Sequence, residues 1–313
     1  MIQGFLFILG NIIVASFQSV FLSHWLKGVN VYFVMAMSFT IVMTLYSTLT
    51  FILGRKHIAT LRGMKADILA LNLVSAGNWI FYFFAIKYLN AAAVVTLTQC
   101  LPPVLITLYT LASRKVVLKS TLIFHGMILL CTILLLRDIL QTPVGHEGNA
   151  VLGSAIAVLC AITVSVTIGV SKVFANKGLP GYVVLSTRFP LLVMISWVMT
   201  PAGIFSTVTP VELAIIAAIA LIGLAMTNFC LQKGIELSSP MVVSTTLSIS
   251  PFVVLLFDRI SKRDATITSQ SLLIFAIVIL SLSCVYFNFR RTRLNARSAS
   301  AHAAMALKTT AEN

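Results

Sequence analysis

Long apolar runs separated by short polar gaps dominate the chain. A helix needs roughly 20 apolar residues to cross a bilayer. The pattern predicts ten such helices, at Gln3–Trp25, Val31–Gly54, Asp67–Tyr88, Ala91–Ala112, Ser120–Leu140, Ala150–Ala175, Tyr182–Thr200, Val211–Lys233, Pro240–Phe257 and Gln270–Phe289. Because the gaps between them are too short to form a soluble domain, we predict an all-α integral membrane protein with ten transmembrane helices.

The composition agrees with this pattern. Hydrophobic residues make up 59% of the 313 residues and charged residues 10%, with a mean hydropathy of +1.02. Soluble domains are closer to half apolar and a quarter charged. A water-surrounded fold of this size has too much surface to hide so many apolar side chains. The first apolar run has no preceding basic region and no small-residue cleavage site, so we expect an uncleaved span.

The net charge of +14 could indicate nucleic-acid binding, but the basic residues lie in the gaps between apolar runs and in the tail. They therefore predict topology and no nucleic-acid partner. With a cytoplasmic amino terminus, 15 Lys and Arg residues fall inside and six outside, which predicts the cell inner (plasma) membrane with both termini cytoplasmic. The cluster Arg259, Lys262 and Arg263 departs from this bias.

An internal repeat explains that departure. A shift of 148 residues places Ala85–Lys115 on Lys233–Arg263. Identical pairs are Leu89/Leu237, Val94/Val242, Val95/Val243, Thr98/Thr246, Pro103/Pro251, Leu108/Leu256 and Ser113/Ser261. Shared apolar composition alone gives some of these matches, whereas the paired prolines and basic corners favour a true repeat.

Each repeat unit would contain five spans, so the second copy would enter the membrane inverted, as in many secondary transporters. We therefore predict two inverted five-helix repeats, over residues 1–145 and 146–290. Residues 291–313 form a basic tail that we expect to be cytoplasmic and disordered.

The sequence resembles the drug/metabolite transporter superfamily in its ten-span, two-repeat (EamA-like) form. The resemblance covers Gly4 to Phe289. Its marks are Ala85–Ala92 followed by Leu101-Pro102-Pro103-Val104, the echo Gly234–Pro240 followed by Ser250-Pro251-Phe252, the stretch Ser186-Thr187-Arg188-Phe189, and Asp258 after the proline helix. The first half departs from the basic feature, with Met37–Thr40 in the matching stretch, and it has no counterpart of Asp258.

Arg188 is the one clear charge within a predicted span, about 10 Å along its helix from Tyr182. A charge in hydrocarbon is costly and often functional. Two interpretations stay open. Arg188 could anchor a carboxylate, phosphate or other electron-rich group of a substrate, or it could snorkel to the interface or bond to helix-end carbonyls.

Prolines and hydroxyl residues mark the fourth and ninth spans. Pro103 (with Pro102) and Pro251 are expected to interrupt and kink these helices near mid-membrane, which frees backbone carbonyls. Such groups persist only where protein or a watery cavity satisfies them. We predict that Thr98, Gln99 and Thr246 line such a cavity, although small hydroxyl residues also serve close helix packing.

Amide side chains complete the predicted site. Asn11 and Gln18 share one face of the first span, and Asn228 and Gln232 share one face of the eighth. Asn72 and Asn78, with Trp79 and Tyr82, are predicted to give an amide and aromatic wall on the third. Buried amides need partners, which could be each other or a substrate. His125, in the fifth span, is either a proton site or an interhelical histidine.

Other chemistries find no support in the sequence. No Asp or Glu lies near the middle of a span, which disfavours cation/proton antiport and favours neutral, zwitterionic or anionic solutes. The five cysteines show no CxxC spacing, so we expect no disulfide framework, metal site or cofactor. No HExxH, GxSxG or phosphate-binding loop motif occurs, so we expect no enzyme.

Pattern and resemblance together predict a secondary transporter of small metabolites or drugs that works by alternating access. The family habit implies export. The expected partners are a small-molecule substrate and the lipid bilayer, and a homodimer stays open. The rivals are a lipid-linked-sugar flippase and a non-transporting membrane sensor or assembly factor.

Overall fold

The computed structural model describes residues 2–114, 116–141, 149–262 and 269–311. Within these segments the chain is helical and contains no β-strand. Ten helices there are long and apolar enough to cross a bilayer, which indicates a multi-pass membrane protein. The all-helical class and the ten apolar helices predicted from the sequence are thus confirmed.

The ten spans follow one another with short connections. The first five are α1 (Ile2–Trp25), α2 (Val31–Leu53), α4 (Lys65–Tyr88), α5 (Ala91–Ala112) and α6 (Lys119–Gln141). The next five are α7 (Ala150–Asn176), α8 (Gly181–Arg188) with α9 (Pro190–Val198), α10 (Pro210–Ala218) with the π-helix η4 (Ile219–Ala225) and α11 (Met226–Leu237), α12 (Pro240–Leu247) with α13 (Ser250–Lys262), and α14 (Ser269–Ala311). Shorter pieces are η1 (Leu26–Gly28), η2 (Arg55–His57), α3 (Ile58–Arg62) and η3 (Ala202–Ser206).

Polar side chains set where several helices begin. The side-chain oxygens of Asn30, Asn90 and Asn149 accept hydrogen bonds from the backbone N–H three residues on, at 3.0, 2.8 and 3.1 Å. Thr209 and Glu212 form a reciprocal capping box at the start of α10. These caps satisfy N–H groups that the first turn leaves without intrahelical partners.

The prolines act differently in the two halves. The ninth span is divided between α12 and α13 just before Pro251, as predicted. In contrast, α5 runs as one helix through Pro102 and Pro103, so the predicted interruption of the fourth span is wrong. The helix continues because the carbonyl of Gln99, which lacks its usual partner at Pro103, accepts a 3.1 Å hydrogen bond from Ser248 Oγ.

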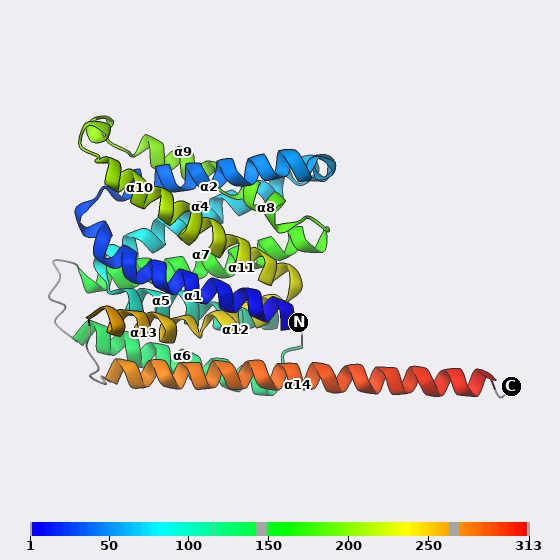
Figure 1. The fold of residues 1–313 in the computed structure, drawn as a ribbon. Helices are drawn as coiled ribbons and strands as arrows, with labels where there is room; N and C mark the ends of the chain where they lie inside the picture. Colours follow the sequence, from blue (N-terminus) through cyan, green and yellow to red (C-terminus); the bar gives the residue numbers. More distant parts are fainter. Residues whose placement is uncertain (1, 115, 142–148, 263–268, 312–313) are drawn as a thin grey trace.

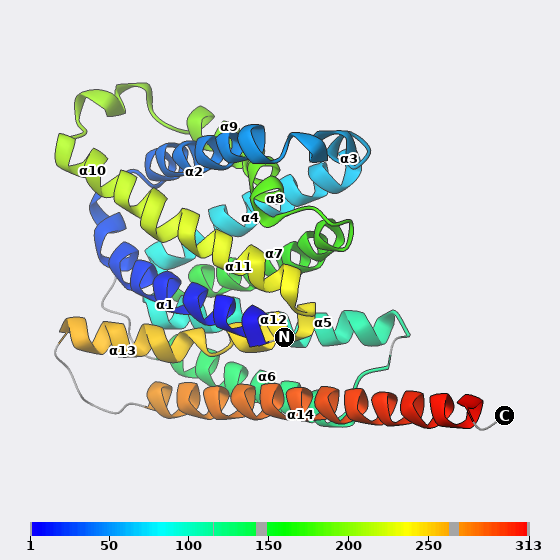
Figure 2. The ribbon, with the colours of Figure 1, turned by 45° about the vertical axis from the view of Figure 1, so that its right-hand side comes forward.

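The spans run roughly side by side, with α2, α8 and α9 along one edge of the bundle and α6 and α14 along the other (Figures 1 and 2). The principal pairs are α1 with α11, α4 with α7, α5 with α12 and α13, α2 with α8 and α9, and α6 with α14. Both chain ends lie at the same end of the bundle in Figure 1, whereas α13 finishes at the opposite end.

The outer and inner faces of the helices have opposite character. Large apolar side chains such as Phe17, Ile52 and Val198 are exposed, at 61%, 65% and 78%. Many polar side chains are buried instead, among them Asn11 and Arg188. This inverted distribution is expected for a bundle whose outer solvent is lipid.

The carboxy-terminal segment differs from the sequence-based expectation of disorder. Helix α14 continues to Ala311 and projects well beyond the bundle (Figure 1). Residues 291–311 are rich in alanine and contain neither glycine nor proline, so helix formation is favoured there. At 1.5 Å per residue this part adds roughly 30 Å to the helix.

Candidate functional site

A cavity of about 100 Å³ lies inside the bundle, between the two halves of the chain. Its walls come from α1, α4 and α5 of the first half and from α7, α8, α11, α12 and α13 of the second. Eight residues predicted from the sequence line it: Asn11, Gln18, Asn78, Trp79, Tyr82, Gln99, Arg188 and Asn228.

Three other predicted residues do not line this cavity. The Thr98 and Thr246 hydroxyls donate to carbonyls of their own helices, those of Val95 at 3.4 Å and Val242 at 2.8 Å. Gln232 is buried, and its side chain packs closely against Gly181. The two threonines thus serve helix packing, the alternative given above for small hydroxyl residues, whereas Gln232 Oε1 has no hydrogen-bond partner in the described chain.

Arg188 ends α8 and is 1% exposed, so it does not snorkel to an interface. Its Nε donates to Ser75 Oγ at 3.0 Å, and the ring of Phe189 lies 5.5 Å from Cζ. Its Nη1 has no hydrogen-bond partner among the described residues. The salt bridges found in the described chain join other basic residues to carboxylates, Lys177 to Asp67 and Lys233 to Glu236.

Asn72 stabilises the break between α8 and α9, which lies beside Arg188. In an unbroken helix the N–H of Leu191 would donate to the carbonyl of Thr187. Here Asn72 Nδ2 donates to Thr187 O at 2.6 Å, and Asn72 Oδ1 accepts from Leu191 N at 3.2 Å. One amide therefore replaces the missing backbone bond, and α4 carries both this clamp and Ser75, the partner of Arg188.

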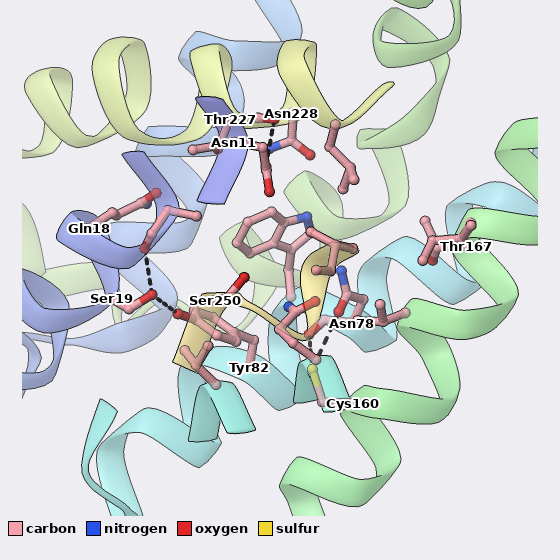
Figure 3. Close-up of a pocket in the computed structure, with 18 of the residues that line it drawn as sticks. Asn11, Gln18, Ser19, Asn78, Tyr82, Cys160, Thr167, Thr227, Asn228 and Ser250 are labelled. Carbon is pink, nitrogen blue, oxygen red and sulfur yellow. Dashed lines mark hydrogen bonds between the residues drawn. The ribbon is translucent and has the colours of Figure 1, made fainter. Parts of the chain in front are cut away.

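Aromatic and amide groups line the rest of the cavity (Figure 3). Tyr82 Oη and Ser19 Oγ form a 2.5 Å hydrogen bond, and the Trp79 and Tyr82 rings meet edge to face at 5.9 Å. Asn11 Nδ2 donates to Thr227 O at 2.9 Å, which joins α1 to α11. Asn78 Oδ1 accepts from the Cys160 thiol at 3.3 Å. The site is therefore preformed by contacts between the two halves.

Several buried polar atoms on the lining residues have no protein partner in the described chain. They are Gln18 Nε2, Trp79 Nε1, Gln99 Oε1, Thr167 Oγ1 and Arg188 Nη1. Buried polar groups are nearly always hydrogen-bonded in folded proteins. These five atoms lie around one cavity, where water or a polar guest can bond to them.

Sequence reasoning missed several lining residues. Ser16, Ser19, Cys160, Thr167 and Thr227 line the cavity without having been predicted. Asn72 was noted in the sequence only as part of a wall, and its clamp role depends on the break at Phe189. Pro190 was the available signal for that break, because proline removes a backbone donor.

His125 lies outside the cavity lining. Its Nδ1 is 2.6 Å from Thr107 Oγ1, and its Nε2 is 3.0 Å from Thr245 Oγ1. It is 1% exposed and links α5, α6 and α12. Of the two interpretations given above, a proton site and an interhelical histidine, this geometry favours the interhelical histidine. The described residues contain no group of three or more side chains suited to hold a metal ion.

Comparisons with known proteins bear on the fold alone. No family model and no curated protein matches the sequence. By structure, 22 chains of solved structures match. One of them, a crystal structure described only as that of a protein, is similar over 92% of this chain and 98% of its own, with a TM-score of 0.67 and 18% sequence identity. The bundle is therefore a fold already known from crystal structures.

Proposed function

We propose that this chain is a secondary transporter of small polar solutes that works by alternating access, as an EamA-like member of the drug/metabolite transporter superfamily. The observation that carries the proposal is the cavity lined by helices from both halves, with unpartnered polar atoms on its walls. Central sites between two halves are the usual arrangement in secondary transporters.

Helix boundaries support two repeats of one unit. Adding 148 to the first residues of α1, α2, α4, α5 and α6 gives 150, 179, 213, 239 and 267. The matching spans of the second half begin at residues 150, 181, 210, 240 and 269. One constant offset therefore aligns all five spans, whereas the sequence identities covered only part of the unit.

The helix pairs support a symmetry that relates the two halves. We call two helices, or two residues, repeat mates when the offset of 148 residues places one on the other. Replacing each helix by its repeat mate turns the pair α1 with α11 into α7 with α4, and both pairs pack closely. The pairs α2 with α8 and α9, α5 with α12 and α13, and α6 with α14 map onto themselves. At the crossing of α5 and α12, Ser248 Oγ donates to Gln99 O, and Cys100 Sγ lies 3.9 Å from Ser248 O. Residues 100 and 248 are themselves repeat mates.

Two close contacts repeat at the two ends of the bundle. Gly4 packs against the α11–α12 corner at Leu237 and Ser238. Gly153 packs against the α4–α5 corner at Tyr88 and Leu89. Leu89 and Leu237 are repeat mates, so the first helix of each half meets the same corner of the other half. Rocking of the halves about the cavity would open one corner while the other stays closed.

Basic residues support the membrane orientation. Helix ends and connections at the end of the bundle that holds both termini carry Arg55, Lys56, Arg62, Lys65, Arg114, Lys119, Lys177 and Lys233. By the positive-inside rule this end is cytoplasmic in the inner (plasma) membrane. Arg259 then lies at the outer end, as an inverted copy of a basic corner would. Export remains the direction proposed from the family resemblance.

Aqueous access to the cavity tests this function. In a cysteine-free background, Ser16→Cys places a thiol in the cavity lining, and Phe17→Cys places one on the 61% exposed outer face at the same depth. Both variants would be treated with a membrane-impermeant maleimide in right-side-out and in inverted vesicles. We expect Ser16→Cys to react from both sides and Phe17→Cys from neither. A Ser16→Cys thiol that stays unreactive in both preparations would contradict transport and favour a sensor or assembly factor.

A further inference from the structure

Arg188 is the only charged residue among the described residues that line the cavity. It is 1% exposed, and its Nη1 has no partner in the described part of the chain. A buried guanidinium without a counter-charge is costly in a membrane interior. The site therefore has a net positive charge that an anionic guest would neutralise.

Two of the four other unpartnered atoms extend this preference, whereas Gln99 Oε1 is an acceptor and Thr167 Oγ1 can donate or accept. Trp79 Nε1 and Gln18 Nε2 are N–H donors without acceptors among the described residues, and both residues line the same cavity as Arg188. Carboxylates accept several hydrogen bonds and donate none when ionised. Asn11 and Asn228 direct their NH₂ groups to backbone carbonyls, which leaves their Oδ1 atoms for any polar tail of the guest.

We propose that the cavity binds one small organic monoanion, with its carboxylate paired to Arg188 and its carbon chain beside Trp79 and Tyr82. This inference rests on the proposed transport function and names its substrate class. A single buried cation balances a single negative charge, so a dianion such as a phosphate monoester would leave an uncompensated charge in the site. A cation would add a second positive charge beside Arg188.

The size of the cavity limits the guest. The centre of a water molecule can move through about 100 Å³ of this cavity, so the cavity has room for several waters or for a small organic molecule. Lipid-linked sugars are far larger, so the cavity suits a small water-soluble acid.

A charge-sensing measurement tests this inference without knowledge of the natural substrate. The thiol of Ser16→Cys, in the cysteine-free background, would react separately with anionic 2-sulfonatoethyl and cationic 2-trimethylammonioethyl methanethiosulfonate. Each rate is divided by the rate of the same reagent with a free thiol in solution. The quotient of the two normalised rates reports the sign of the local field.

We expect the normalised quotient to favour the anionic reagent by about tenfold or more, given Coulomb interaction at protein dielectric. Arg188→Gln should reduce the quotient to about one or below, whereas Arg188→Lys, which keeps the charge, should preserve a quotient above one. The measurement with Arg188 intact stands alone if a variant fails to fold.

A quotient near or below one with Arg188 intact would overturn the monoanion site, and so would a quotient unchanged by Arg188→Gln. In both cases the thiol has reacted, so the hydrated cavity and the transport function would still stand. A thiol that reacts with neither reagent would instead overturn the transport function and the monoanion site with it.

Discussion

The buried guanidinium of Arg188 is better suited to function than to stability. It has one hydrogen bond, to Ser75, and no carboxylate partner in the described chain. Removing an unpaired buried charge usually stabilises a protein, and function is often what retains such a group.

Replacing Arg188 by methionine should therefore stabilise the fold. We expect Arg188→Met to raise the free energy of unfolding in detergent by about 1–3 kcal/mol, because an incompletely bonded buried charge is removed. The same variant should lose solute transport. Ser75→Ala is the matched control, since it removes the partner of Nε and should lower stability. A lower melting temperature for Arg188→Met would contradict this account of the site.

Glycine at position 153 is required by a close contact between helices. A Cβ there would lie 2.8 Å from both Tyr88 Cβ and Leu89 Cγ. We expect Gly153→Ala to destabilise the protein by about 1–3 kcal/mol through overpacking. In the same helix, Gly169 has no neighbour within 4 Å of its added Cβ. Gly169→Ala should therefore be neutral or stabilising by up to about 1 kcal/mol. Equal melting temperatures for the two variants would refute the contact.

At the level of elements, the broken seventh span depends on a side chain from another helix. Asn72 supplies the acceptor for Leu191 N and the donor for Thr187 O. Loss of this amide leaves two buried backbone groups without partners, which costs about 1–3 kcal/mol.

Amide hydrogen exchange at Leu191 measures this clamp. Asn72→Ala should speed exchange at Leu191 and lower the melting temperature. Asn228→Ala is the control, because Asn228 donates to Leu224 O within its own span and forms no hydrogen bond with residues 187–191 in the described chain. Unchanged protection at Leu191 in Asn72→Ala would exclude the clamp.

Lys172 plays a similar role at the end of α11. Its Nζ donates to the carbonyls of Ile235, Glu236 and Ser238 at 3.0, 3.1 and 2.8 Å. These terminal carbonyls lack intrahelical partners. We expect Lys172→Met to increase hydrogen exchange across residues 235–241. Lys233→Met, which removes only a half-exposed ion pair with Glu236, should have a much smaller effect. Similar exchange in both variants would rule out this bonding.

The spans could be predicted from sequence because each apolar run is as long as a bilayer is thick and is bounded by capping or turn residues such as Asn30, Asn90 and Pro240. The internal geometry could not. The continuity of α5 through Pro103 depends on Ser248, whose Oγ donates to Gln99 O, and the last carbonyl of the π-helix at Ile219–Ala225 accepts a 2.7 Å hydrogen bond from Tyr46 Oη. Local sequence carries no record of such partners.

The site could be predicted at residues whose side chains must have hydrogen-bond partners when they are buried. Buried amides and a buried arginine require partners, which pointed to Asn11, Gln18, Asn78 and Arg188. Threonines can satisfy themselves by bonding to the preceding turn of their own helix, so Thr98 and Thr246 did not need a cavity. Which of many serines and threonines face the cavity follows only from helix rotation, which periodicity in an apolar span does not fix.

For the whole molecule, the account depends on two halves that face opposite ways across the membrane. The constant offset of 148 residues, the exchange of helix pairs and the reciprocal glycine contacts all support this relation. In the proposed architecture, an odd number of spans per half would place the cavity between inverted copies. It would also account for a basic corner at each end of the bundle.

The sidedness of two repeat mates tests this relation most directly. Ser113 follows α5 and Ser261 lies near the end of α13, and both are exposed. Single cysteines at these positions would be labelled with an impermeant maleimide in intact cells and in inverted vesicles. We predict that Ser113→Cys reacts from the cytoplasmic side and Ser261→Cys from the opposite side. Labelling of both cysteines from one side would contradict the inverted architecture and the transport mechanism built on it.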